Sequence, residues 1–356
     1  MLGREDMFQD IELHDLLKRQ KEGSIALVDV RSPQEFAEFH IPGSINIPVF
    51  NNEERAEVGT IYKQISPEAA KEKGLEIFSA KLPQFIAEFQ SLGKEKVVYC
   101  WRGGMRSKTA ATVVDLMGQQ ISRLNGGIRS YRKWVVNKLE QKQFSPKMYV
   151  LNGYTGSGKT ILLHRLKQLG YPVLDLEGLA KHRGSIFGQI GLNPNNQKTF
   201  ESLLVQEMER YNQMPFILLE GESKRIGKAT LPLFLHEEKE ASMQLFIHLP
   251  LEKRIQNILR EYNPEEHQAQ VIEAFQRIQK HIHTPVAKQI ADDIEQGNFS
   301  SAIALLLEYY YDPRYEHTLH HYPGDKQIHI HANDLDEALN AVVSFIRQEE
   351  HTNIKL

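Results

Sequence analysis

The feature that most constrains the fold of this chain is an octapeptide in its second half, GYTGSGKT at 153–160. It matches the pattern G-x-x-x-x-G-K-T, follows an expected strand (Met148–Asn152) and precedes an amphipathic run, ILLHRLKQLG, expected to be helical. In this context the glycines let backbone amides approach phosphate oxygens, Lys159 supplies a positive charge, and Thr160 can hold a metal ion or an oxygen. The motif predicts a phosphate-binding site in an α/β domain. The residues expected to form it are Gly153, Thr155, Gly156, Ser157, Gly158, Lys159 and Thr160.

Charged residues follow the next two expected strands, Tyr171–Leu176 and Phe216–Leu219. Acidic side chains at the carboxyl ends of such strands face the phosphate loop, where they position a metal ion or a reacting hydroxyl. The alternative is that they cap the helices that follow. The candidate supporting residues are Asp175, Glu177, Arg183, Glu220, Glu222, Lys224 and Arg225.

A second candidate site surrounds the chain's single cysteine, Cys100, which ends an expected strand, VVYC. A glycine-bearing loop follows, Trp101-Arg102-Gly103-Gly104-Met105-Arg106, and Ser107 is expected to cap the next helix. Loop amides, the helix N-terminus and the two arginines all favour a thiolate. We predict that Cys100 is a reactive nucleophile in an anion-binding loop. The alternative is an inert, buried cysteine.

The N-terminal third alternates helix and strand patterns, which favours a parallel α/β sheet with its site at the carboxyl ends of the strands. We expect helices at Phe8–Glu22, Pro33–Phe39 and Leu82–Leu92, and strands at Ser24–Val30 and Ser44–Ile47. The pattern breaks near residues 140–147, after a helix at Tyr131–Lys142 that could bridge two domains. The predicted domains are residues 1–143, with that helix, and 144–356.

Composition restricts the compartment and the partners. No apolar run is long enough for a membrane span, and the start, MLGREDMFQDIELHDLL, is acidic and amphipathic, unlike a signal peptide. One cysteine cannot form an intramolecular disulfide, so we expect a reducing, cytoplasmic location and no membrane partner.

The net charge of −3 conceals a basic segment. From Cys100 to Lys147, ten lysines and arginines face only Asp115 and Glu140, enough for a surface that follows nucleic-acid phosphates. The alternative, which the charge pattern supports equally well, is a solvated basic helix face that binds nothing. The candidate nucleic-acid contacts are Arg123, Arg129, Arg132, Lys133 and Lys138.

Three further patterns favour structural roles. Lys253, Arg254 and Arg260 could cover phosphates as a helical lid, although a solvated face explains them at least as well. The histidines of QIHIHAN alternate with isoleucines and are expected on a wet strand face, so we predict no metal site. The tyrosines of EYYYDPRYEH are expected to pack in a helix and not to stack on bases.

Two parts of the chain resemble known families. LVDVRSPQEFAEFHIPGSINIP with the CWRGGMR loop resembles the rhodanese (sulfurtransferase) domain, over about residues 10–140. By that resemblance Cys100 is the nucleophile that accepts sulfur or selenium. We interpret Asp29 and Arg31 as a structural ion pair, and His40 as a residue that packs in a turn and not as a base.

The combination of CWRGGMRS, GYTGSGKT, DLEGLAKHRGS and LLEGESKRIG resembles the tRNA 2-selenouridine synthase family along essentially the whole chain. The resemblance implies a transferase that replaces sulfur by selenium in wobble 2-thiouridine of tRNA, with selenophosphate as donor. It also implies an S-geranylated intermediate made from geranyl diphosphate. No tightly bound cofactor is expected; Mg²⁺ is a candidate ion, and a selenophosphate-producing enzyme is a candidate partner.

Two other functions fit parts of the pattern. One is a thiosulfate or persulfide sulfurtransferase with a regulatory nucleotide-binding domain. The other is a non-catalytic adaptor that binds tRNA or nucleotides, against which the intact cysteine loop argues.

Overall fold

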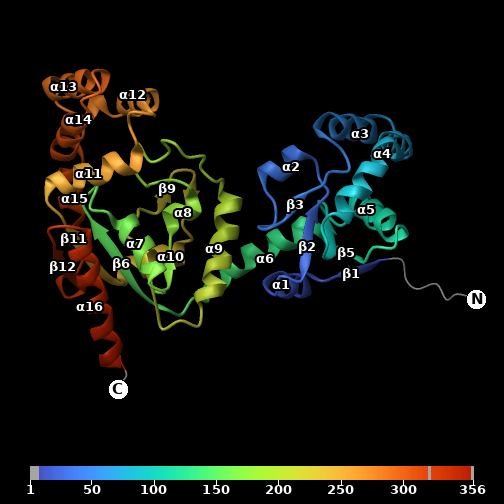
Figure 1. The fold of residues 1–356 in the computed structure, drawn as a ribbon, viewed down its shortest axis with the longest axis horizontal. Helices are drawn as coiled ribbons and strands as arrows, with labels where there is room; N and C mark the ends of the chain where they lie inside the picture. The colour runs from blue at the N-terminus through green and yellow to red at the C-terminus, as the bar shows by residue number, and fades with distance from the viewer. Residues whose placement is uncertain (1–7, 320–321, 354–356) are drawn as a thin grey trace, which may run out of the picture. The chain divides into compact units, whose positions relative to one another are not determined.

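The computed structural model describes residues 8–319 and 322–353, and the chain divides into two compact units, Met1–Gln141 and Lys142–Leu356. The acidic start of the chain lies partly outside the described residues. Both units are α/β, each built on a five-stranded parallel sheet, which confirms the predicted fold class (Figure 1). Among the helices that the structure describes, none is long and apolar enough to cross a membrane.

The sheet of the first unit has the strand order β1-β5-β4-β2-β3. Its strands are β1 (Gln9–Ile11), β2 (Ile25–Asp29), β3 (Ile45–Asn46), β4 (Glu95–Tyr99) and β5 (Ile121–Leu124). Its helices are α1 (Leu13–Lys21), α2 (Pro33–Glu38), α3 (Asn52–Gln64), α4 (Pro67–Gln90), α5 (Met105–Leu116) and α6 (Gly127–Gln141). The strands alternate in sequence with helices, so both sheet faces are covered and β2 and β4 are almost wholly buried.

Two sequence predictions for this unit need correction. The expected helix Phe8–Glu22 is a short strand followed by α1, because Gln9–Ile11 pairs with Ser122–Leu124 at the sheet edge. The expected helix Leu82–Leu92 is only the last part of α4. By contrast, Pro33 lies in the first turn of α2 as predicted, behind a capping box formed by Ser32 and Glu35.

The sheet of the second unit has the strand order β12-β11-β6-β8-β7. Its strands are β6 (Lys147–Gly153), β7 (Val173–Leu174), β8 (Phe216–Glu220), β11 (Met243–His248) and β12 (Gln327–His331). A hairpin, β9 (Arg225–Ile226) with β10 (Ala229–Thr230), lies outside this sheet. The expected strand Tyr171–Leu176 shortens to two residues because Asp175 already caps a helix.

The helices of the second unit cover the sheet and extend beyond it. They are α7 (Lys159–Gln168), α8 (Leu176–Ala180), α9 (Gln197–Tyr211), α10 (Leu233–Ala241), α11 (Leu251–Tyr262), α12 (Gln268–Gln276), α13 (Thr284–Glu295), α14 (Phe299–Leu306), α15 (Asp312–Leu319) and α16 (Leu335–Asn353). A π-helical turn, η2 (Leu307–Tyr311), joins α14 to α15, and 3-10 turns η1 (Gln279–His281) and η3 (Gly324–Lys326) complete the unit. Helices α12–α14 form their own apolar core around Ile290 and Phe275.

Candidate active site

Cys100 follows β4 directly, and α5 begins only five residues later, at Met105. The loop is therefore shorter than predicted, because Met105 and Arg106 already belong to the helix. Gly104, and not Ser107, occupies the N-cap position. Trp101 and Met105 are exposed, 46% and 60%, whereas Cys100 is only 3% exposed. A reagent must therefore reach the sulfur through the loop.

Ser107 contacts the thiol instead of capping the helix. Its Oγ lies 3.1 Å from the Sγ of Cys100 and also donates to the carbonyl of Gly104 at 3.2 Å. Ser107 is completely buried. The Cys100 sulfur thus lies at the N-terminal end of α5, in contact with the Ser107 hydroxyl.

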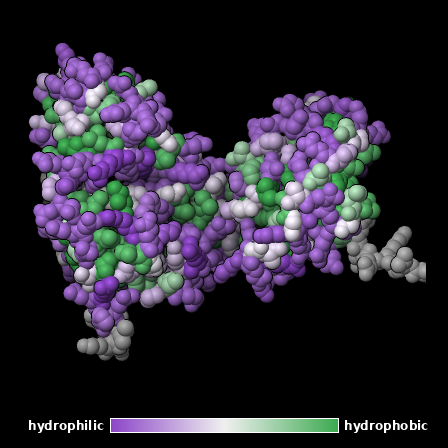
Figure 2. Space-filling view, viewed as in Figure 1, coloured by the Kyte–Doolittle hydropathy of each residue, from purple (hydrophilic) through white to green (hydrophobic). Residues whose placement is uncertain are grey.

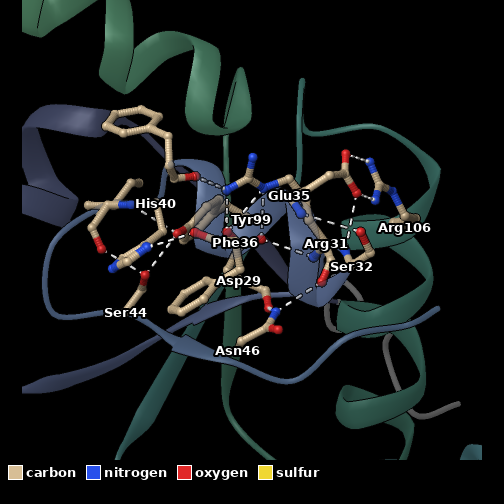
Figure 3. Close-up of polar contacts among 12 residues, drawn as sticks. Asp29, Arg31, Ser32, Glu35, Phe36, His40, Ser44, Asn46, Tyr99 and Arg106 are labelled. Carbon is tan, nitrogen blue, oxygen red and sulfur yellow. Dashed lines mark hydrogen bonds and ion pairs between the residues drawn. The ribbon is translucent and has the colours of Figure 1, made fainter. Parts of the chain in front are cut away.

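Arg106 does not face the thiol as a free cation. Its guanidinium binds the carboxylate of Glu35 through two hydrogen bonds of 2.5 and 3.1 Å (Figure 3). Burial alone would raise the pKa of Glu35, but the hydrogen bond and charge of Arg106 outweigh burial and hold this pKa below its usual value. The prediction that Arg106 neutralises an anion at the thiol therefore needs correction: its charge is largely compensated. Arg102 is exposed.

Arg123, a candidate tRNA contact, supports the cysteine loop. It donates to Asp10 at 2.7 Å and to the carbonyl of Gly103 at 3.1 Å. The other four candidate contacts lie on α6, where Arg129 and Lys133 are exposed, and Arg132 and Lys138 are half-buried.

Gly127, which the sequence analysis did not single out, lies directly beneath the cysteine loop. A Cβ at this position would approach the Cys100 carbonyl to 2.3 Å and the Gly103 nitrogen to 2.6 Å. The next two amides donate to the loop: Ile128 N to the Cys100 carbonyl at 2.9 Å, and Arg129 N to the Trp101 carbonyl at 3.2 Å. The Gly126-Gly127 pair was the available sequence clue.

The expected structural ion pair of this unit is present. Asp29 and Arg31 are completely or almost completely buried, and the Arg31 guanidinium binds both carboxylate oxygens at 2.6–3.0 Å. Arg31 also donates to the Phe39 carbonyl at 2.5 Å. His40 stacks on Phe36, with ring centroids 4.0 Å apart, and its Nδ1 lies 2.9 Å from the Phe36 carbonyl (Figure 3). Both observations agree with structural roles.

The phosphate loop of the second unit connects β6 to α7, as the motif predicts. The Nζ of Lys159 donates to the Gly153 carbonyl at 2.9 Å, so the lysine folds back over its own loop. Burial acts to lower the pKa of Lys159, but Tyr315 and nearby carboxylates, Glu222 foremost, outweigh it and raise the pKa. Lys159 is therefore positively charged at neutral pH. Tyr315, which sequence analysis placed only in core packing, accepts from the Gly153 amide at 2.6 Å.

Two acidic residues lie against the loop and against each other. The Thr160 hydroxyl donates to Glu177 Oε2 at 2.9 Å, and the Glu177 amide donates to Glu220 Oε1 at 2.5 Å. Burial, followed by the charge of Glu222, raises the pKa of Glu177 to about 8. Burial, followed by the charges of Asp175 and Glu177, also raises the pKa of Glu220 well above its usual value. Burial therefore disfavours the charged form of both carboxyl groups.

Asp175 takes the alternative role, that of a helix cap. Its carboxylate accepts from the Gly178 amide at 2.7 Å and pairs with His164 at 3.0 Å. Arg183 pairs with Glu261 at 3.2 Å. Among the other supporting candidates, Glu222 and the exposed Lys224 line the cavity over the phosphate loop, whereas the exposed Arg225 donates to Gly227 in the hairpin.

Helix α11 holds the phosphate loop in place. Arg254 is buried, donates to the Thr155 carbonyl at 2.9 Å and binds Asp312 at 2.6 and 2.9 Å. Asn257 donates to the Gly156 carbonyl at 2.9 Å. Arg254 is therefore neither a solvated residue nor a lid arginine, while Lys253 and Arg260 are exposed.

The cavity beside the phosphate loop has a volume of about 450 Å³. Lys159, Thr160, Glu177 and Glu222 line it, and further positive charge comes from Arg183, Lys224 and Lys239. Such a mixture of loop glycines, cations and hard oxygen atoms suits a phosphorylated ligand.

The histidines of β12 are exposed, and Ile330 between them is buried, as the alternation predicts. His248 on β11 stacks between them, with centroids 5.2 Å from His329 and 4.4 Å from His331. Burial, with the neighbouring histidines, lowers the pKa of His248 to about 4.

Comparisons with known proteins cover both units. Residues 12–133 match the rhodanese-like domain family, and residues 146–276 match the tRNA 2-selenouridine synthase AAA domain. A rhodanese-related protein from Thermoplasma volcanium is 22% identical, covering 36% of this chain and 93% of that one, with a TM-score of 0.23.

Full-length relatives match as well. The tRNA 2-selenouridine synthase of Bdellovibrio bacteriovorus is 32% identical over 345 residues, covering 85% of this chain and 90% of the relative. That of Hydrogenovibrio crunogenus is 33% identical over 359 residues, covering 92% and 96%. At this identity and coverage across both units, the chain belongs to the tRNA 2-selenouridine synthase family.

Proposed function

We propose that this protein replaces sulfur by selenium in the wobble 2-thiouridine of tRNA, with selenophosphate as donor, through an S-geranylated intermediate. The observation that carries the proposal is the Cys100 thiol, held by Ser107 at the start of α5 in a member of this family. The phosphate loop adds a site that suits the diphosphate of a phosphorylated substrate.

The chemistry proceeds in two displacements. The thiocarbonyl sulfur first attacks C1 of geranyl diphosphate: a C–S bond forms, the C–O bond breaks, and diphosphate leaves. The selenium of selenophosphate then adds at C2 of the base, and the former sulfur departs as geranyl thiol. Water cleaves the P–Se bond, which releases phosphate and leaves 2-selenouridine. Alkylation is useful because a thiocarbonyl sulfur is a poor leaving group, whereas a thiolate carried by the prenyl chain is a good one.

The two units divide this work. Cys100 is the selenium-handling residue, and the amides of Gly103 and Gly104 with the Ser107 hydroxyl stabilise the anion. Lys159 and the phosphate-loop amides hold the diphosphate as its negative charge develops.

Two additional binding roles complete the proposal. Thr160 and Glu177 supply oxygen ligands of the kind that Mg²⁺ prefers, and such an ion would neutralise part of the diphosphate charge. The exposed Arg129 and Lys133 of α6 bind tRNA phosphates.

Mass spectrometry of the nucleosides tests the sequence of steps. Transfer RNA containing 2-thiouridine is incubated with the protein, geranyl diphosphate and selenophosphate, each omitted in turn. We expect the S-geranyl nucleoside without selenophosphate and 2-selenouridine only with both. Full selenation without geranyl diphosphate would contradict the intermediate. Sulfur transfer to cyanide with ATP hydrolysis and no need for tRNA would favour the sulfurtransferase alternative.

Two variants test the division of labour. Cys100→Ala should abolish selenation and leave geranylation intact, and loss of both activities would refute the division. Lys159→Ala should slow geranylation by about 100-fold or more, as expected for removal of one strong electrostatic contact to the departing group. Lys167→Ala, at an exposed position of the same helix, is the matched control. Equal rates in the two lysine variants would refute the diphosphate role.

A further inference from the structure

An apolar pocket lies among the helices that extend beyond the second sheet. Its lining is almost entirely hydrophobic. Helix α14 contributes most to it, with Phe299 and Ala302 among its residues, and Val271 of α12 and Ile294 of α13 complete this side. The enclosed space is about 60 Å³. Figure 2 shows hydrophobic residues at the surface over α14. An apolar pocket of this kind is typical of a binding site for a hydrophobic group.

This pocket adjoins the phosphate-loop cavity directly. The residues that line both spaces are Thr155, Ser185, Ile258, Tyr262 and Tyr311. Thr155 belongs to the phosphate loop itself, and Ile258 lies on the helix that holds the loop. At the boundary the Ser185 and Tyr262 hydroxyls lie 3.2 Å apart. A ligand can therefore place a phosphate group on the loop and an apolar group in the pocket at the same time.

The pocket wall also contains the π-helical turn η2. Leu307 and Tyr311 lie at the two ends of this turn, and both line the pocket. A π turn has wider hydrogen-bonded rings than an α-helix. Such turns are rare and frequently lie at functional sites. Here it presents the two side chains to the pocket beside the phosphate cavity.

We propose that this pocket holds the hydrocarbon chain of the prenyl diphosphate whose diphosphate lies on the phosphate loop, and that Ala302 packs against this chain. This inference rests on the proposed function. An amphiphile with an anionic head and an apolar tail matches the two adjoining spaces, because each part meets its own kind of surface. The enclosed space is small, so it holds the distal part of a short chain while the proximal part lies between Ile258 and Tyr262.

A chain-length series on the unaltered protein tests the pocket without any mutation. Calorimetric affinities are measured for pyrophosphate, dimethylallyl diphosphate, geranyl diphosphate and farnesyl diphosphate. We expect geranyl diphosphate to bind about 100-fold more tightly than pyrophosphate, as burial of roughly four methylenes gives. We expect no further gain for farnesyl diphosphate. Equal affinities for pyrophosphate and geranyl diphosphate would overturn the inference.

Filling the pocket tests its location. Ala302→Leu places a larger apolar side chain in the space, whereas Ala291→Leu alters a half-buried alanine of the same helical core that does not line the pocket. We expect Ala302→Leu to bring the affinity for geranyl diphosphate down to that for pyrophosphate and leave pyrophosphate binding unchanged. Ala291→Leu should change neither.

The outcomes separate the inference from the function on which it rests. Tight, Lys159-dependent binding of geranyl diphosphate that survives Ala302→Leu would overturn the pocket and leave the proposed function standing. Geranyl diphosphate binding that is insensitive to Lys159→Ala would overturn the diphosphate role, and the pocket assignment with it.

Discussion

Substituting Gly127 by alanine should disable the cysteine loop without touching a reacting group. The new Cβ would lie 2.3 Å from the Cys100 carbonyl and 2.6 Å from the Gly103 nitrogen. Both are backbone atoms and cannot rotate away as a flexible side chain would. The residue also adopts a φ of +58°, which an L-residue with a Cβ disfavours. The loop must therefore move away from α6.

The expected loss of stability has two parts. The left-handed backbone conformation costs an alanine about 1–2 kcal/mol. Displacing the loop strains or breaks the hydrogen bonds from Ile128 N to Cys100 and from Arg129 N to Trp101, each contributing about 1 kcal/mol. We expect the free energy of unfolding to fall by roughly 3–4 kcal/mol.

Tryptophan fluorescence during urea unfolding measures this loss. The chain has two tryptophans, Trp101 and Trp134, and both lie in the first unit, so the signal reports that unit alone. Gly118→Ala is the matched control, because Gly118 has a φ of +73° and no atom lies within 4 Å of the position that a Cβ would take there. It should lose only about 1–2 kcal/mol. Equal losses in the two variants, with unchanged alkylation of Cys100, would refute the steric argument.

Three other perturbations have defined outcomes. Asp29→Asn leaves the buried Arg31 charge uncompensated and should lower the free energy of unfolding of the first unit by about 3–5 kcal/mol, measured by the same fluorescence. Ser107→Ala removes the hydroxyl beside the sulfur and should slow alkylation of Cys100 by iodoacetamide about tenfold. Because the pKa of Glu177 is raised, the folded state binds more protons than the unfolded state between pH 4.5 and about 8. The free energy of unfolding therefore falls as pH rises through that range, by at most about 1.4 kcal/mol per pH unit. Glu177→Gln should flatten this slope in calorimetry.

Each of these predictions has a matched comparison. Asp10→Asn breaks a more exposed ion pair with Arg123 and should lose about 1 kcal/mol or less. Ser107→Thr keeps a hydroxyl, and alkylation as slow as in Ser107→Ala would contradict a role for the hydroxyl. For Glu177, Glu252→Gln on exposed α11 surface should leave the pH slope intact. A slope that persists unchanged in Glu177→Gln would assign the proton to another group.

Local patterns predicted the parts of the structure that local forces determine. The strand-loop-helix around Gly153–Thr160 and the capping box at Ser32 depend on residues within one turn of each other. By contrast, β1 forms because Gln9–Ile11 pairs with β5, more than a hundred residues away. A three-residue edge strand has too little sequence to overcome the helical periodicity around it, so only tertiary pairing could reveal it.

The candidate sites show the same difference between local and long-range signals. The motifs located Cys100 and Lys159, because a glycine-rich loop after a strand is a local signal. They could not show that Gly127 underlies the cysteine loop or that Arg254 holds the phosphate loop, since each contact joins distant segments. They also could not separate a capping role for Asp175 from a cavity role for Glu177, because both are acidic residues after the same short strand.

The partners of the arginines change how the thiol site works. From the sequence, positive side chains would stabilise the anion at Cys100. In the structure Arg106 is bound to Glu35 and Arg123 to Asp10, so each of these two cations is matched by a carboxylate. These ion pairs hold the loop's shape, and under the proposed function an anion at Cys100 would rely more on the amides at the start of α5 and the Ser107 hydroxyl than on the two compensated charges. Raising the salt concentration, which screens exposed charges but not buried dipoles, should therefore change Cys100 alkylation little while weakening tRNA binding strongly.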